Sequence, residues 1–169
     1  MRMLAVIGAL AIIAAIGATI FFFGGFYSVA GTAAEPGVVG WALSNVRKAS
    51  IDRHAGDQPP ISLDEPATIQ TGARAYAARG CANCHGGPGV PWAKFSEGLR
   101  PDPPDLKDIA KEREPAQLFW VIKNGVKMTG MPSFGATGAT DQEIWTIVAL
   151  VKKLPTLTDA DYKAWTAAP

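Results

Sequence analysis

The sequence predicts an all-α protein with one long apolar helix at its amino terminus and a small helical domain after it. From Met3 to Ala34 there is no charged residue, although the 169 residues include 31 Lys, Arg, Asp and Glu. Three later segments combine apolar residues at helical spacing with recognisable helix ends. Alternating β-branched runs are scarce, which argues against a β domain.

The first segment, Leu4–Tyr27, comprises 24 mostly apolar residues. As a helix it would be about 36 Å long, which is enough to cross a bilayer. Residues 1–27 are therefore interpreted as a transmembrane anchor. The alternative is a signal peptide cleaved near residues 29–31, but the run is longer than an ordinary signal core and ends in bulky aromatic residues. Arg2 precedes the span, so the positive-inside tendency places the remaining chain on the exported side.

Residues 28–65 are predicted to form a stalk that is partly helical. Apolar residues recur at helical spacing between Pro36-Gly37 and Pro59-Pro60, with three basic residues among them. A helix at about 38–53 has two interpretations, which the sequence leaves open. It lies at the membrane surface, or it packs on the soluble domain or on a partner subunit.

The domain is assigned to residues 66–155 and contains three predicted helices. The first begins at Pro66 and ends near Gly80, and the second runs from Pro115 to Asn124. The third follows Thr140, whose Thr-Asp-Gln-Glu sequence is a capping-box pattern, and it ends at two lysines. Residues 86–113 form a long connection rich in Pro and Gly, which suggests a loop wrapped around another group. Residues 156–169 form a tail with a short helix.

Composition excludes several classes of protein. The net charge is +1, far from the basic balance of a nucleic-acid binder. Cys and His each occur only twice, too few for a disulfide scaffold or a zinc site with several ligands.

Both cysteines lie in one motif, Cys81-Ala82-Asn83-Cys84-His85. This C-x-x-C-H pattern is that of c-type haem attachment. Two thiols about one helical turn apart can each add to one porphyrin vinyl group, and the adjacent imidazole can ligate the iron. A thioredoxin-like site would need a βαβ setting, and a zinc site would need more ligands than the chain offers. We therefore expect one covalent haem c, with Cys81 and Cys84 as attachment sites and His85 as a metal ligand.

With this motif, the chain resembles a membrane-anchored bacterial class I cytochrome c over about residues 66–155. Two further features carry the resemblance: the sequence Gly130-Met131-Pro132 before the last helix, and a first and a last helix that cross in that family. The expected crossing residues are Gly72 and Tyr76 on the first helix, with partners on the last helix, Ile144 and Trp145. One departure is the four residues between Tyr76 and Cys81, where the family commonly has three.

The resemblance implies a fold of helices wrapped around the haem, with Met131 as the second axial ligand of the iron. Met128, in the same loop, is then expected to pack near the haem face, and His54 to be a solvated surface residue. The second imidazole nitrogen of His85 should donate to a backbone carbonyl, for which Pro88 is the expected residue. Trp92, Arg100 and Trp120 could reach the haem propionates, although for Trp120 core packing at helical spacing with Leu118 and Val121 is the preferred interpretation.

The predicted function is one-electron transfer by a carrier of the inner membrane whose haem domain faces the periplasm. Its expected partners are a quinol-oxidising complex, a dehydrogenase or a terminal oxidase, and no small-molecule substrate is expected. Lys123 and Lys127 flank the methionine loop and would steer docking, unless they are merely a solvated basic face. The alternative is a cytochrome subunit bound permanently in a dehydrogenase or respiratory complex. A haem peroxidase or sensor is a third hypothesis. It has little support, because a peroxidase needs an acid–base residue near an open coordination position and His54 is the only other histidine.

Overall fold

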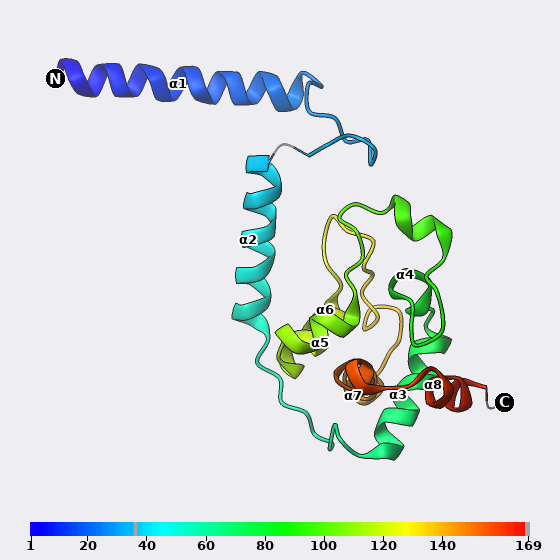
Figure 1. Cartoon of the computed structure of the whole chain (residues 1–169). Coiled ribbons are helices and arrows are strands. Elements are labelled where there is room, and N and C mark those ends of the chain that lie inside the picture. Colours follow the sequence, from blue (N-terminus) through cyan, green and yellow to red (C-terminus); the bar gives the residue numbers. More distant parts are fainter. Residues whose placement is uncertain (36, 168–169) are drawn as a thin grey trace. The chain divides into compact units, whose positions relative to one another are not determined.

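The protein is helical throughout the described residues, which in this computed structural model are 1–35 and 37–167. They divide into two compact units, Met1–Glu35 and Pro36–Pro169 (Figure 1). Their only β pairing is an isolated bridge between Gly87 and Val90, so the all-α prediction is confirmed. The elements are α1 (Arg2–Phe23), α2 (Gly37–His54), α3 (Pro66–Ala78), α4 (Ala82–His85), the 3₁₀ helix η1 (Lys94–Gly98), α5 (Leu106–Glu112), α6 (Pro115–Asn124), α7 (Asp141–Lys153), the 3₁₀ helix η2 (Leu154–Thr156) and α8 (Asp159–Thr166).

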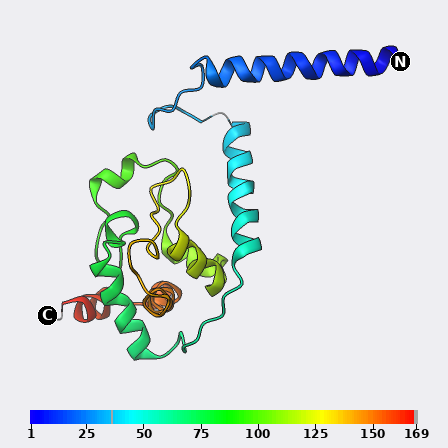
Figure 2. The same cartoon turned by 180° about the vertical axis from the view of Figure 1, so that it is seen from behind.

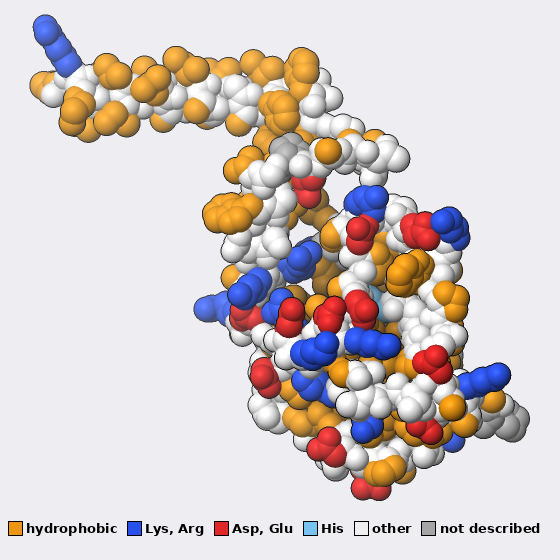
Figure 3. All heavy atoms as spheres, in the orientation of Figure 1, with side chains coloured by type: hydrophobic (Ala, Val, Ile, Leu, Met, Phe, Trp, Pro, Cys, Tyr) orange, Lys and Arg blue, Asp and Glu red, His pale blue; other side chains and the backbone are white. Residues whose placement is uncertain are grey.

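The first unit is dominated by α1, which has 22 residues and an apolar surface on the face seen in Figure 3. Its hydropathy of 2.6 and its length allow it to cross a membrane, and an amino-terminal signal sequence has the same properties. The helix ends at Phe23, where the Gly24 N–H donates to the Ile20 carbonyl at 2.8 Å. It therefore ends four residues before the end of the apolar run that predicted it, Leu4–Tyr27.

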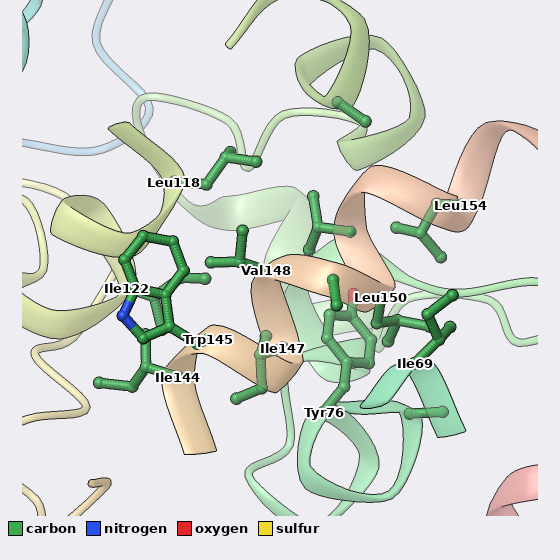
Figure 4. Packing of buried hydrophobic residues seen from close by; sticks show 14 of the residues in the cluster. Ile69, Tyr76, Leu118, Ile122, Ile144, Trp145, Ile147, Val148, Leu150 and Leu154 are labelled. Atoms are coloured by element: carbon green, nitrogen blue, oxygen red, sulfur yellow. The ribbon is translucent and has the colours of Figure 1, made fainter. Parts of the chain in front are cut away.

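The second unit is built on the crossing of α3 and α7, which lie side by side in both views (Figures 1 and 2). Eight consecutive residues of α7, from Ile144 to Val151, are buried. Tyr76 of α3 packs with Ile147 and Leu150 of α7 in the core (Figure 4). The buried face follows directly from the apolar run of α7, whose ends carry the predicted Thr140 cap and terminal lysines.

The crossing itself occurs at Gly72, as expected, but its partners on α7 differ from the prediction. A Cβ at Gly72 would collide with the Thr146 carbonyl and approach Leu150. Only glycine lets the two backbones come this close. Trp145 instead faces α6, where its ring stacks on Phe119 with centroids 4.2 Å apart. Adjacent residues of a helix point about 100° apart, so an apolar run alone does not tell which residue meets which neighbour.

The segment at 86–113 is more ordered than the predicted loop, since it contains η1 and α5. Asp105 caps α5 by accepting from the Lys107 N–H at 2.7 Å. The expected carboxyl-terminal helix is present as α8. Its Tyr162 is buried and meets Tyr76 edge to face, with centroids 6.5 Å apart.

Candidate haem site

The end of α3 brings Cys81 into position through a Schellman motif. Gly80 has φ +73, its N–H donates to the Ala77 carbonyl at 3.0 Å, and the Cys81 N–H donates to the Tyr76 carbonyl at 3.1 Å. This closed helix end lies within the four residues between Tyr76 and Cys81 and reverses the chain direction just before the motif.

The two cysteines belong to one helical turn. Cys81 caps α4, and its carbonyl accepts from the His85 N–H at 3.0 Å, so Cys81 and Cys84 lie three residues apart on adjoining surface. Both are free thiols. Burial raises the pKa of the Cys81 thiol to about 12, so the neutral form of the sulfur is favoured at this position. A thioether has no such proton to lose, so this environment suits covalent attachment.

The His85 imidazole is held by a hydrogen bond of 3.0 Å between Nδ1 and the Pro104 carbonyl oxygen. A carbonyl only accepts, so Nδ1 carries the proton and Nε2 keeps its lone pair. Burial lowers the pKa of His85, which favours this neutral form. The prediction that Pro88 supplies the carbonyl is wrong. Pro88 is buried in the turn that follows, whereas Pro104 approaches from a segment 19 residues away.

The loop after His85 is tied to the helix that precedes the motif. The Tyr76 hydroxyl donates to the Gly86 carbonyl at 2.7 Å within the core. Burial is the main cause that raises the pKa of Tyr76, so this donor stays protonated. Gly87 lies against the Tyr162 ring of α8. The backbone on both sides of His85 is therefore fixed by contacts within the chain.

A cavity of about 420 Å³ opens beside His85. Trp92 and Arg100, two of the expected propionate contacts, line it, whereas Trp120 does not. The Trp120 ring stacks on His54, with centroids 5.9 Å apart. The cavity is lined by Cys84, His85, Trp92, Ser96, Glu97, Arg100, Asp102, Pro103, Pro104 and Asp105.

The two candidate sulfur ligands, Met128 and Met131, lie in one loop between α6 and α7 and differ in their burial; this loop is called the methionine loop. Met131 is half-buried and packs against the hydrophobic core, and its backbone accepts from the Val126 N–H at 3.1 Å. Met128 has φ 59 and is 81% exposed, so the described chain covers little of it. The Leu99 side chain lies against Gly130, so this loop meets the segment that follows His85.

Two ion pairs hold the ends of this loop. Arg79 makes paired hydrogen bonds of 2.8 and 2.7 Å to the Glu143 carboxylate and also donates to the Thr137 and Gly138 carbonyls. The pairing raises the pKa of Arg79 and lowers that of Glu143. Lys123 pairs with Asp141 at 2.8 Å, so part of its charge is balanced within the chain.

These residues fit a covalent haem: two thiols on one turn, an imidazole whose Nδ1 is bonded so that Nε2 can ligate iron, a cavity beside it, and a half-buried methionine in a loop that meets the segment after His85. The fold and the site thus define a small helical protein of the cytochrome c class. The family model described as "Cytochrome C oxidase, cbb3-type, subunit III" matches residues 67–151, about half of the chain, and the chain belongs to this family. No curated protein and no solved structure matches the chain.

Family membership carries three conclusions. The chain is a monohaem class I cytochrome c, its cofactor is a covalently bound haem c with iron, and its function is haem-based electron transfer. A cytochrome c domain indicates an electron carrier rather than a catalytic enzyme. The predictions of family and cofactor are confirmed.

Proposed function

We propose that this protein is a one-electron carrier whose haem is attached through Cys81 and Cys84 and ligated by His85 and Met131. The observation that carries the proposal is the Nδ1 hydrogen bond of His85 to Pro104, which leaves Nε2 as the ligand atom. Among the methionines, Met131 packs against the core while Met128 is exposed, which supports Met131 as the sulfur ligand.

The haem iron supplies the redox chemistry, a one-electron change between ferric and ferrous. The chain supplies the axial ligands of the iron and encloses part of the haem site. His85 presents a neutral imidazole whose orientation is held by Pro104, and the hydrogen bond increases its basicity as a ligand. The soft Met131 thioether would raise the reduction potential relative to a second imidazole. The Leu99 side chain lies against Gly130, so the segment after His85 meets the loop that carries Met131.

A peroxidase or sensor function has less support. Such a site needs an open or opening coordination position with an acid–base group near it. His54 stacks on Trp120, and its Nδ1 lies 2.7 Å from the Ser50 carbonyl of its own helix. It is thus engaged on α2 and does not line the cavity beside His85.

We further propose that residues 1–27 are a retained anchor of the inner membrane and that the haem domain, 66–155, faces the periplasm. The apolar surface and length of α1 support the anchor, and the single Arg2 before it supports the orientation. Residues 28–65 then connect the two, and residues 156–169 form the tail that contains α8.

The partners are respiratory or dehydrogenase complexes that face the periplasm, between which the protein shuttles electrons. A permanent place in such a complex is the second candidate. It is favoured by the description of the family, which names a subunit of a cbb3-type cytochrome c oxidase. Purification in mild detergent distinguishes the two. A mobile carrier elutes alone, whereas a subunit elutes with other chains in fixed proportion.

The proposed ligation is tested on the purified full chain. Mass spectrometry after acid–acetone extraction should show the chain plus one haem, and the ferric spectrum should show the weak charge-transfer band of a methionine–iron bond. A chain free of haem after extraction refutes covalent attachment. A covalent haem without that band refutes methionine ligation alone.

A further inference from the structure

The two ends of helix α2 differ in how much of their surface contacts the rest of the chain. Its last turn is docked on α6 and on the segment before it. Ile51 is buried, Asp52 accepts from Gln117 at 2.6 Å, and His54 stacks on Trp120. The Arg113 guanidinium lies 3.7 Å from the Asp52 carboxylate. An apolar contact, a hydrogen bond, an ion pair and an aromatic stack thus fix this end to the haem domain.

The first ten residues of α2 carry large apolar side chains that the chain itself does not cover. Val38 is 72% exposed, Trp41 68% and Val46 66%. Apolar side chains lie over the amino-terminal part of α2 in Figure 3, and basic side chains gather toward its other end. An exposed tryptophan between two exposed valines indicates that this surface is covered by something other than solvent.

Charge and chain length indicate what covers it. Between residues 37 and 51 the only charged residues are Arg47 and Lys48, and the first acid is Asp52. Only residues 24–36 separate α1 from α2, a connection of 13 residues that spans about 45 Å at most. If α1 crosses the bilayer, the start of α2 therefore lies within this distance of the surface where α1 emerges. Tryptophan and basic side chains favour the interface of a bilayer, and anionic lipids attract the latter.

We propose that residues 37–46 of α2 insert into the lipid headgroup interface, while the docked last turn holds the haem domain to that helix. The proposal rests on the anchor proposed for residues 1–27. Trp41 and Asp52 are 11 residues apart, about 16 Å along the helix axis. The haem domain is thereby kept at a short, defined distance from the membrane, and residues 28–65 do not act as a long free tether.

Nitroxide labelling of the full holoprotein in vesicles of zwitterionic and anionic phospholipid tests this directly. The native cysteines are consumed by the haem, so one introduced cysteine is the only reactive thiol. Val38→Cys is the test position, and Lys48→Cys is the matched position on the same helix. We expect the label at 38 to collide more with oxygen than with a water-soluble nickel chelate, and the label at 48 to show the reverse.

A label at 38 that is as accessible to nickel as the label at 48 means that the helix is in water, and overturns the proposal. A label at 38 that neither reagent reaches means that protein covers this surface, and also overturns it. The anchor is read separately in the same vesicles by alkaline extraction. Release of the protein there refutes the anchor, whereas retention with a nickel-accessible position 38 refutes only the role of α2.

Discussion

The two sides of the haem site are held in different ways. On the histidine side, the Schellman end of α3, the Tyr76 bond to Gly86 and the His85 bond to Pro104 fix the backbone and the imidazole together. On the methionine side, a tight loop positions the backbone of Met131, and the bond between its N–H and the Thr129 hydroxyl, at 3.1 Å, is local.

The difference indicates that the two proposed iron ligands, His85 and Met131, depend on different parts of the chain for their positions. The histidine side draws its contacts from segments as far as 19 residues away, so its geometry depends on the whole domain. The methionine side is closed by residues 125–133, whose hydrogen bonds, such as those from Val126 to Met131 and from Met131 to Thr129, are local, and the Leu99 side chain lies against Gly130. Changes on the histidine side should therefore affect folding and haem retention, and changes on the methionine side should affect mainly the spectrum.

The largest effect is expected from the attachment residues. The double variant Cys81→Ala with Cys84→Ala should carry no haem after acid–acetone extraction, because no thioether remains, and most of the chain should accumulate as apoprotein. Either single variant should keep one thioether or none. Mass spectrometry measures this, with Asn83→Ala on the same turn as a control that keeps the haem. Extraction-resistant haem in the double variant contradicts the assignment.

A smaller effect is expected from Tyr76→Phe, which leaves the buried Gly86 carbonyl without its donor. The free energy of unfolding of the holoprotein should fall by about 1–3 kcal/mol. Tyr162→Phe is the matched control, since it keeps the ring that packs against Tyr76 and should cost less. Denaturant titration compares the two variants. Equal losses would show that the Tyr76 hydroxyl does not fix the histidine side.

The smallest effect concerns the Arg79–Glu143 pair, whose side chains are about a quarter exposed. Because Arg79 lowers the pKa of Glu143 below its ordinary 4.5, the pair's full contribution to stability is present above that pH and is lost as the pH falls through the lowered value. Glu143→Gln should thus be less stable than the parent at pH 7, with the difference shrinking below pH 4.5. Asp141→Asn, which removes a more exposed pair, should show a smaller difference. A difference for Glu143→Gln that grows in acid would contradict this role.

Local signals in the sequence predicted much of this molecule. The C-x-x-C-H motif indicated the haem. Helix starts such as Glu114-Pro115 and the Thr140 cap predicted α6 and α7 closely, because these signals depend on neighbours in the chain. The crossing at Gly72 could also be predicted, since close backbone approach requires a small residue.

Contacts between distant segments were harder to predict. Periodicity shows that α7 has a buried face, but not that Thr146 meets Gly72 while Trp145 stacks on Phe119. The carbonyl that binds His85 was sought in the next turn, whereas the chain brings Pro104 back from the far end of a long segment. The pairing of Lys123 with Asp141 likewise joins two helices whose relative placement no local pattern specifies.

The central proposal, iron ligated by His85 and Met131, is tested most directly by comparing Met131→Ala with Met128→Ala in the ferric spectrum of the holoprotein. Met131→Ala should lose the methionine–iron band, lower the potential and bind an added ligand such as imidazole, while the thioethers retain the haem. Met128→Ala should keep the band and the stability of the parent, because its side chain is 81% exposed. Loss of the band in Met128→Ala with its retention in Met131→Ala would contradict the account.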